Sequence, residues 1–210
     1  MKSAFWQLEK LGQVRLSRHF QMRQFLYSEI AATSGILNMP DDPDLAIHTG
    51  KQLCEHVLEP LVDEFGPLII RSGFRSAKLN DYGNKHGLKC AKNEKNYAYH
   101  IWDHRDANGH CGAAACIVIP AFKEGRTTLS TWQELAWWID DNLPYHRLTF
   151  FKHDNAFNIG WHEKSQKEIY SWQPKPHWLK NNRRALNYEA TIHQSCSDCV
   201  RSSPAAFANL

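Results

Sequence analysis

The segment from Asp42 to Gly66 constrains the fold most, because it predicts an amphipathic helix that must bury one face. Asp42 can cap a helix, and Pro43 fits the first helical turn. Apolar residues then recur at helical spacing up to the glycine: Leu53, Val57, Leu58, Leu61, Val62 and Phe65. Residues 67–71 (PLIIR) follow at once and have the short apolar pattern of a buried strand. The order predicts a helix packed on a sheet.

Later segments predict more strands and a second helix. Residues 115–119 (ACIVI) indicate a second buried strand, and residues 130–134 (STWQE) a capped helix start. The polar residues 81–96 predict an exposed loop. Three further strands are expected at 147–152, 157–162 and 168–172. Because helices precede most of the strands, the pattern favours an α+β fold.

Length and composition favour one globular domain. The 210 residues, 42% of them hydrophobic, fit a domain over 1–174 and a C-terminal arm over 175–210, where the pattern dissolves. The net charge of +3 and the lack of a basic run argue against a nucleic-acid surface. The first twenty residues carry scattered charges, which predicts neither a signal peptide nor a membrane span. We therefore expect a cytoplasmic protein with mostly reduced cysteines; the sequence leaves open its release by a lytic partner and its oligomeric state.

Residues 98–120 (AYHIWDHRDANGHCGAAACIVIP) combine a loop rich in histidine and acid with the start of a strand. Catalytic zinc takes three ligands from His, Asp, Glu or Cys on a rigid base. His100, Cys116 and His162 meet that description, with Asp103 as an alternative middle ligand. If His100 points away, the next candidates are Asp103, Asp106 and His110.

Short motifs between residues 28 and 80 resemble those of the zinc D-alanyl-D-alanine carboxypeptidase and endolysin family, which shares a fold with the hedgehog signalling domain. The motifs are Ser-Glu, Asn-x-Pro, Leu-x-Pro-Leu and Ser-Gly-Phe-Arg-Ser followed by Leu-Asn, with phenylalanine for the family's tyrosine. The matching residues are Ser28, Glu29, Asn38, Pro40, Leu58, Pro60, Leu61, Ser72, Gly73, Phe74, Arg75, Ser76, Leu79 and Asn80. The resemblance implies a small central antiparallel sheet flanked by helices, a Zn²⁺ cofactor and hydrolysis of peptides or peptidoglycan fragments. It extends more weakly to about residue 172.

The second half departs from the family's metal motif. In the family, Ser-x-His-x-x-Gly-x-Ala-x-Asp supplies a His and an Asp to zinc, and a later Trp-x-His supplies the third ligand. Here residues 101–111 are inserted after His100, and Cys116 stands where the Asp belongs. Trp161 and His162 replace the last motif, one residue shorter. Since a thiolate can bind zinc, the resemblance implies a His/Cys/His centre of His100, Cys116 and His162.

The general base is harder to assign. These peptidases need a carboxylate or His a few residues before the last ligand, and residues 156–160 contain neither. Asp154, Glu163 and Asp103 are the candidate catalytic substitutes, with His153 as a further one.

Arg75 is the leading candidate for substrate binding. Its guanidinium could hold a substrate carboxylate in the cleft, or it could pin its own turn to backbone carbonyls. Ser72 and Trp161 complete the candidate substrate-binding set.

Three functions remain open from the sequence. The leading hypothesis is a zinc-dependent peptidase acting on peptidoglycan-type peptides. The alternatives are a catalytically degenerate binding module and a hydrolase with another small-molecule substrate. Cys196 and Cys199, with His193 nearby, make only half of a structural zinc site, so we expect reduced thiols in a tail.

Overall fold

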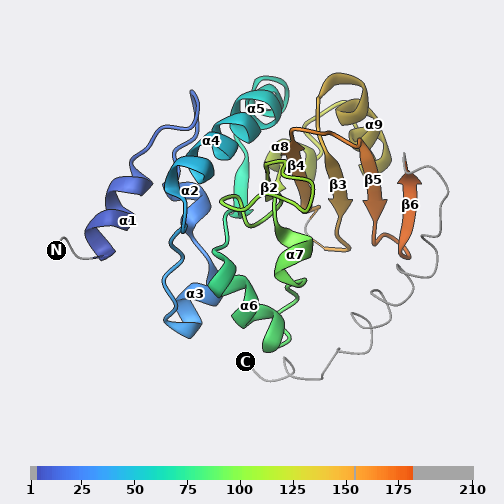
Figure 1. Ribbon diagram of the computed structural model, residues 1–210. Helices are drawn as coiled ribbons and strands as arrows, with labels where there is room; N and C mark the ends of the chain where they lie inside the picture. Colours follow the sequence, from blue (N-terminus) through green and yellow to red (C-terminus); the bar gives the residue numbers. More distant parts are fainter. Residues whose placement is uncertain (1–3, 154, 182–210) are drawn as a thin grey trace.

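A computed structural model describes residues 4–153 and 155–181 and contains one six-stranded sheet flanked by helices (Figure 1). The strand order is β1-β2-β4-β3-β5-β6, and every neighbouring pair is antiparallel except β3 and β5. The strands are β1 (Ile69–Ser72), β2 (Gly112–Val118), β3 (Arg147–Phe150), β4 (Phe157–His162), β5 (Glu168–Ser171) and β6 (His177–Lys180). The predicted α+β class is confirmed, but the sheet is larger than the small one expected.

The predicted helix after Asp42 is present as three consecutive elements, α4 (Pro43–Leu53), the π-helical turn η1 (Cys54–Leu58) and α5 (Glu59–Phe65). The Asp42 carboxylate accepts the Leu45 N–H at 3.0 Å, and Gly66, with φ of 80°, ends α5. The remaining helices are α1 (Ala4–Gly12), α2 (Arg23–Leu26), α3 (Glu29–Ser34), α6 (Ala77–Lys85), α7 (Asn93–Asn96), α8 (Pro120–Lys123) and α9 (Trp132–Asn142).

The core lies between these helices and one face of the sheet. Ala113, Ala115 and Ile117 alternate along β2 and are fully buried, and α4 contacts both β2 and β4. The predicted capped helix is α9, whose Trp132 ring lies 5.2 Å from that of Phe150 on β3. The opposite face of β2 therefore carries Gly112, Ala114 and Cys116, and the loop before β2 lies at the start of this strand.

Two segments differ from the prediction. The expected loop at 81–96 contains the end of α6 and all of α7, because the buried Asn80 side chain donates to Asn93 Oδ1 at 2.7 Å and fixes the segment. In the expected arm, β6 pairs with β5, so the sheet continues past residue 174. The rest of that arm, including Cys196, Cys199 and His193, lies outside the described residues.

Candidate functional site

The loop that the sequence inserts before β2 is anchored at its base. The Ala114 N–H donates to the Tyr99 carbonyl at 2.8 Å, and the Trp102 indole N–H donates to the Ala114 carbonyl at 3.1 Å. Trp102 is fully buried against Gly50, where a Cβ would lie only 2.9 Å from the indole. The base of the inserted loop is therefore held rigidly, and its polar residues follow further along the loop.

Gly112 allows this loop to meet the end of β4. Gly112 pairs with His162 across the β2–β4 ladder. A Cβ at Gly112 would lie 2.4 Å from the Ala98 carbonyl oxygen and 2.7 Å from the His162 ring. The absence of a side chain therefore brings the loop, β2 and the His162 imidazole together.

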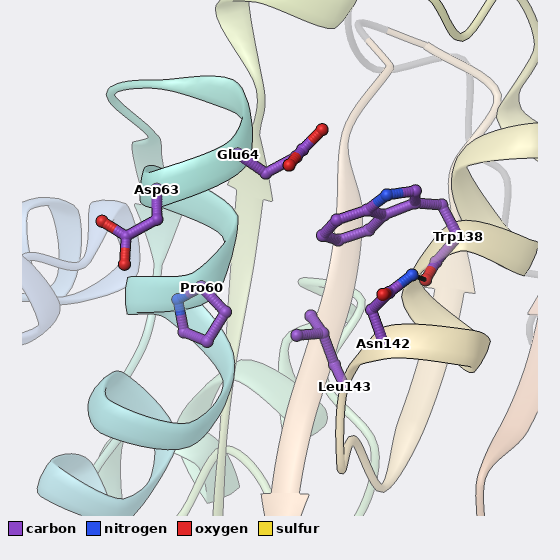
Figure 2. Close-up of a pocket in the computed structure, with 6 residues that line it drawn as sticks. All are labelled: Pro60, Asp63, Glu64, Trp138, Asn142 and Leu143. Carbon is purple, nitrogen blue, oxygen red and sulfur yellow. Dashed lines mark hydrogen bonds between the residues drawn. The ribbon is translucent and has the colours of Figure 1, made fainter.

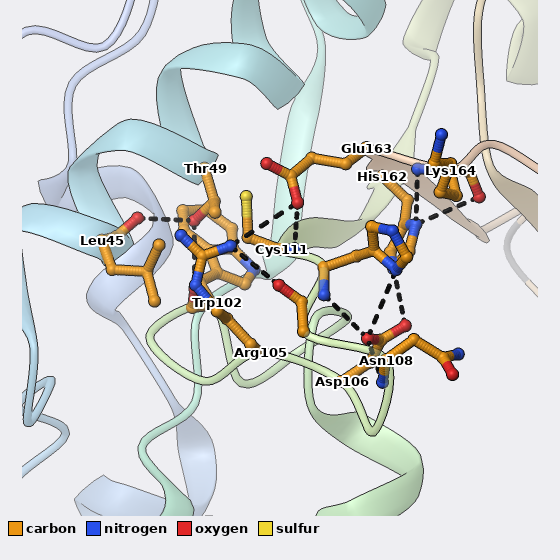
Figure 3. A network of polar contacts seen from close by, with 12 residues as sticks. Leu45, Thr49, Trp102, Arg105, Asp106, Asn108, Cys111, His162, Glu163 and Lys164 are labelled. Carbon is orange, nitrogen blue, oxygen red and sulfur yellow. Dashed lines mark hydrogen bonds and ion pairs between the residues drawn. The ribbon is translucent and has the colours of Figure 1, made fainter.

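Four side chains, Asp106, His110, His146 and His162, form what we call the imidazole cluster. Figure 3 shows two of them, Asp106 and His162, with their ion pair as a dashed line. Asp106 Oδ2 lies 3.4 Å from His162 Nε2, and Asp106 Oδ1 lies 3.7 Å from His110 Nδ1. The His146 ring stacks on the His162 ring with centroids 4.5 Å apart, and the His110 ring centroid is 5.9 Å from that of His162. One carboxylate thus lies between two imidazoles.

The cluster holds Asp106 as a carboxylate. Partial burial opposes ionisation of Asp106. Two groups of contacts outweigh this effect: the backbone N–H groups of His110 and Asn108, each donating to the carboxylate at 2.9 Å, and the neighbouring imidazoles. The pKa of Asp106 is therefore lowered. Across from it, Nδ1 of His162 lies within 3.1 Å of the Lys164 backbone, which turns Nε2 toward Asp106. This arrangement resembles the outer-shell contacts that orient metal-binding histidines.

Glu163 borders the cluster as a second carboxylate. The Cys111 N–H donates to Glu163 Oε2 at 2.7 Å and lowers the pKa of this exposed side chain, and Arg105 lies 3.6 Å away (Figure 3). Burial, followed by the neighbouring Glu163, raises the pKa of the Cys111 thiol to about 11. Glu163 is thus ionised, and Cys111 is a neutral thiol.

The predicted ligands His100, Cys116 and His162 are not brought together. His100 is buried with Nδ1 3.2 Å from the Gly73 carbonyl oxygen. Cys116 pairs with Asn158, four residues along β2 from Gly112, so about 13 Å of strand separates it from His162. Among the described residues, the one group of three His, Cys, Asp or Glu side chains with ligand atoms within 4.8 Å of one another is Asp41, Asp103 and His104.

Burial keeps both His100 and Cys116 uncharged. Burial and the nearby Arg75 lower the pKa of His100 to about 3. Burial raises the pKa of the Cys116 thiol to about 11, against the opposing effect of Arg71. Both side chains are therefore neutral at pH 7.

The candidate general bases differ in burial and in their distance from the imidazole cluster. Asp154 lies outside the described residues, and His153 is exposed. Asp103 is buried, and its Oδ2 accepts the Asp41 N–H at 2.7 Å. Of the described candidate bases, Glu163 interacts electrostatically with His110 of the imidazole cluster.

The candidate substrate-binding residues are engaged within the fold. The Arg75 guanidinium donates to Asn80 Oδ1 at 2.9 Å and to Cys90 Sγ at 3.1 Å, which matches the turn-pinning alternative. Ser72 ends β1 opposite Cys116, and Trp161 packs against the core from β4.

His146 is a cluster residue that the sequence reasoning missed. It precedes β3, and its N–H donates to the Gly160 carbonyl at 2.6 Å, which places its ring over His162. The signal was the predicted hairpin of strands 147–152 and 157–162, because antiparallel pairing sets the start of one strand beside the end of the other.

A separate hollow of about 360 Å³ lies between α5 and α9 (Figure 2). Its lining residues are Pro60, Asp63, Glu64, Trp138, Asn142 and Leu143. Its wall contains two carboxylates, Asp63 and Glu64, but no histidine or cysteine, so it does not offer the mixed donor set of the imidazole cluster.

The chain matches no family model, no curated protein and no solved structure. None of the helices in the described residues is long and apolar enough to cross a membrane.

Proposed function

We propose that this chain is a zinc-dependent hydrolase with the hedgehog/DD-peptidase fold and that Asp106, His110 and His162 hold the metal. The observation that carries the proposal is the Asp106 carboxylate, which lies 3.4 Å from His162 Nε2 and 3.7 Å from His110 Nδ1. Each imidazole lies beside a different oxygen of this carboxylate, and two imidazoles with one carboxylate are a donor set that catalytic zinc commonly takes, leaving a fourth position for the reaction. The inserted loop thus supplies the ligands that the family's own motif lacks here.

The residues around the three donors have distinct tasks in this proposal. The Lys164 backbone orients His162, and the Asn108 N–H holds the Asp106 carboxylate. Zinc, when bound, supplies Lewis-acid activation for hydrolysis. Glu163 is the carboxylate available to take a proton, although its lowered pKa makes it a weak base.

The substrate class follows from the resemblance in the first half of the chain. Peptides of the peptidoglycan type, including D-alanyl-D-alanine ends, are the proposed substrates. Arg75 is bonded to Asn80 and Cys90, so we do not assign it to substrate binding in this proposal.

The test measures bound zinc and peptide hydrolysis on the same purified protein. We expect the wild type to hold zinc at the cluster and to lose hydrolysis of D-alanyl-D-alanine peptides with a chelator. His162→Ala should lose that zinc and the activity, whereas His56→Ala, at an exposed position on η1, should keep both. Unchanged zinc content and unchanged activity in His162→Ala would refute the centre.

A non-catalytic binding module is the second candidate, and one observation favours it. Glu163 accepts the Cys111 N–H and lies 3.6 Å from Arg105, so the candidate base beside the cluster is already engaged. Tight binding of the peptide without turnover, in zinc-loaded protein, would support this candidate over the enzyme.

A further inference from the structure

A second group of ligand-type side chains lies at the base of the inserted loop, away from the imidazole cluster. Asp41 precedes α4, and Asp103 and His104 belong to the loop before β2. One ligand atom from each of the three lies within 4.8 Å of the other two. Segments that are about sixty residues apart in the chain therefore present three donors at one point.

Two of the three donors are held in place by other contacts. Asp103 Oδ2 accepts the Asp41 N–H at 2.7 Å, and Asp103 Oδ1 lies 3.2 Å from His104 Nδ1. The His104 ring stacks on Tyr97 with centroids 4.9 Å apart and only 10° between the planes. The Asp103 and His104 donors are thus ordered before a ligand arrives, and a ligand atom of the exposed Asp41 already lies within 4.8 Å of both.

The charge at this point is not balanced by the described residues. The Asp103 side chain has no exposed surface, and a buried carboxylate is costly unless an opposite charge accompanies it. Within residues 4–153 and 155–181, neither Asp103 nor Asp41 forms an ion pair with a lysine or arginine, and the His104 imidazole is the basic side chain beside Asp103. A bound dication would balance both carboxylates.

We infer that Asp41, Asp103 and His104 bind a divalent transition-metal cation that links the segment before α4 to the inserted loop. An imidazole nitrogen with two carboxylate oxygens suits zinc better than calcium or magnesium, which prefer oxygen ligands alone. Zinc ligands at roughly 2.0–2.2 Å from the metal lie roughly 3.4 Å from one another, close to the present 3.2 Å between Asp103 Oδ1 and His104 Nδ1. The site is structural and does not depend on the proposed catalytic centre.

The experiment counts zinc on the full chain by equilibrium dialysis with zinc alone. Asp41→Asn combined with His104→Gln removes two donors at exposed and half-buried positions, and Asp44→Asn on α4 is the matched control. We expect the double variant to bind one zinc fewer than the wild type and Asp44→Asn to bind the same number. Equal zinc in the double variant and the wild type would overturn the site.

Crossing these variants with His162→Ala separates the two proposals. In a His162→Ala background, zinc should still raise the melting temperature, and the shift should vanish when Asp41→Asn and His104→Gln are added. A zinc-dependent shift that persists in the triple variant contradicts this site. If His162→Ala leaves the zinc count unchanged while the double variant lowers it, the catalytic proposal fails and this one stands.

Discussion

The two ends of β2 offer similar side chains in very different environments. At its start, Gly112 faces His162, and the half-buried Asp106 and His110 lie beside that imidazole. Toward its other end, Cys116 faces Asn158, and burial leaves its thiol with a pKa of about 11. The family's motif would place the metal at the Cys116 position, whereas this chain gathers its charged and titratable groups at the Gly112 position.

The difference teaches that the surroundings decide whether a side chain is in its metal-binding form, which is the charged form for a carboxylate or a thiol and the neutral form for an imidazole. Backbone N–H groups and imidazoles outweigh burial at Asp106 and lower its pKa, so its carboxylate is ready to bind a cation. At Cys116, burial outweighs the opposing effect of Arg71 and keeps the thiol neutral, so this end of the strand offers no ionised ligand. The start of β2 is therefore the end of the strand where a metal would meet an ionised ligand.

The largest expected effect is a loss of stability when a side chain is added at Gly112, at the start of β2. Gly112→Ala should lower the free energy of unfolding by about 3 kcal/mol, because its Cβ would lie 2.4 Å from the Ala98 carbonyl oxygen, a backbone atom that cannot turn away. Urea denaturation measures the loss. Gly12→Ala, whose Cβ would meet Arg23 Cβ at 3.4 Å, is the control and should stay within about 0.5 kcal/mol of the wild type. Equal stability of the two variants would show that the loop does not press on Gly112.

The periodicity of the sequence predicted two helices and most strands of the sheet, but it did not predict the imidazole cluster. The helix after Asp42, the capped helix at Thr131 and strands β1 to β5 each follow from local patterns of apolar and capping residues, whereas β6 was expected to be part of an arm. Asp106 and His110 were only reserve candidates, because their contact with His162 depends on how an inserted loop folds back over β2. Spacing along the chain carries no signal for that contact.

The motif resemblance also misled the choice of ligands at Cys116. Matching the family's Gly-x-Ala-x-Asp placed Cys116 beside His162, but the β2–β4 register pairs Cys116 with Asn158. A motif fixes which residues alternate on a strand face, whereas the register between strands decides which residues meet. The sequence therefore predicted the right strand and the wrong partner.

The second largest effect is expected on zinc affinity, when Asp106 beside the start of β2 loses its charge. Asp106→Asn should weaken zinc binding about 100-fold, equivalent to about 2.7 kcal/mol, because it removes the ionised donor between the two imidazoles. Competition with a chromogenic chelator measures the dissociation constant. Asp141→Asn, at an exposed position on α9, should bind zinc like the wild type. Wild-type affinity in Asp106→Asn would remove Asp106 from the centre.

The third effect concerns the buried imidazole of His100. Its pKa falls from the ordinary 6.5 to about 3 in the folded state, so below pH 6.5 the unfolded chain binds a proton that the folded chain does not. The stability from His100 is therefore complete above pH 6.5 and is lost as the pH falls toward 3, at about 1.4 kcal/mol per pH unit. In His100→Gln, whose amide can still donate to the Gly73 carbonyl, stability should fall less steeply between pH 6 and pH 4. Parallel urea-unfolding profiles for the variant and the wild type would show that His100 does not titrate as a buried group.

The smallest effect is expected from a substitution of Cys116. This substitution tests most directly which end of β2 binds the metal. A zinc ligand cannot be replaced by alanine without loss of affinity, but a packed neutral thiol can, at a cost of less than about 1 kcal/mol for the few atoms removed. Cys116→Ala should therefore keep the zinc dissociation constant of the wild type and change the urea midpoint only slightly, since the side chain is partly exposed and pairs across from Asn158. If Cys116→Ala instead loses zinc while Asp106→Asn retains it, the metal binds where the family's motif would place it, and the Gly112 end of β2 holds a polar cluster without a metal.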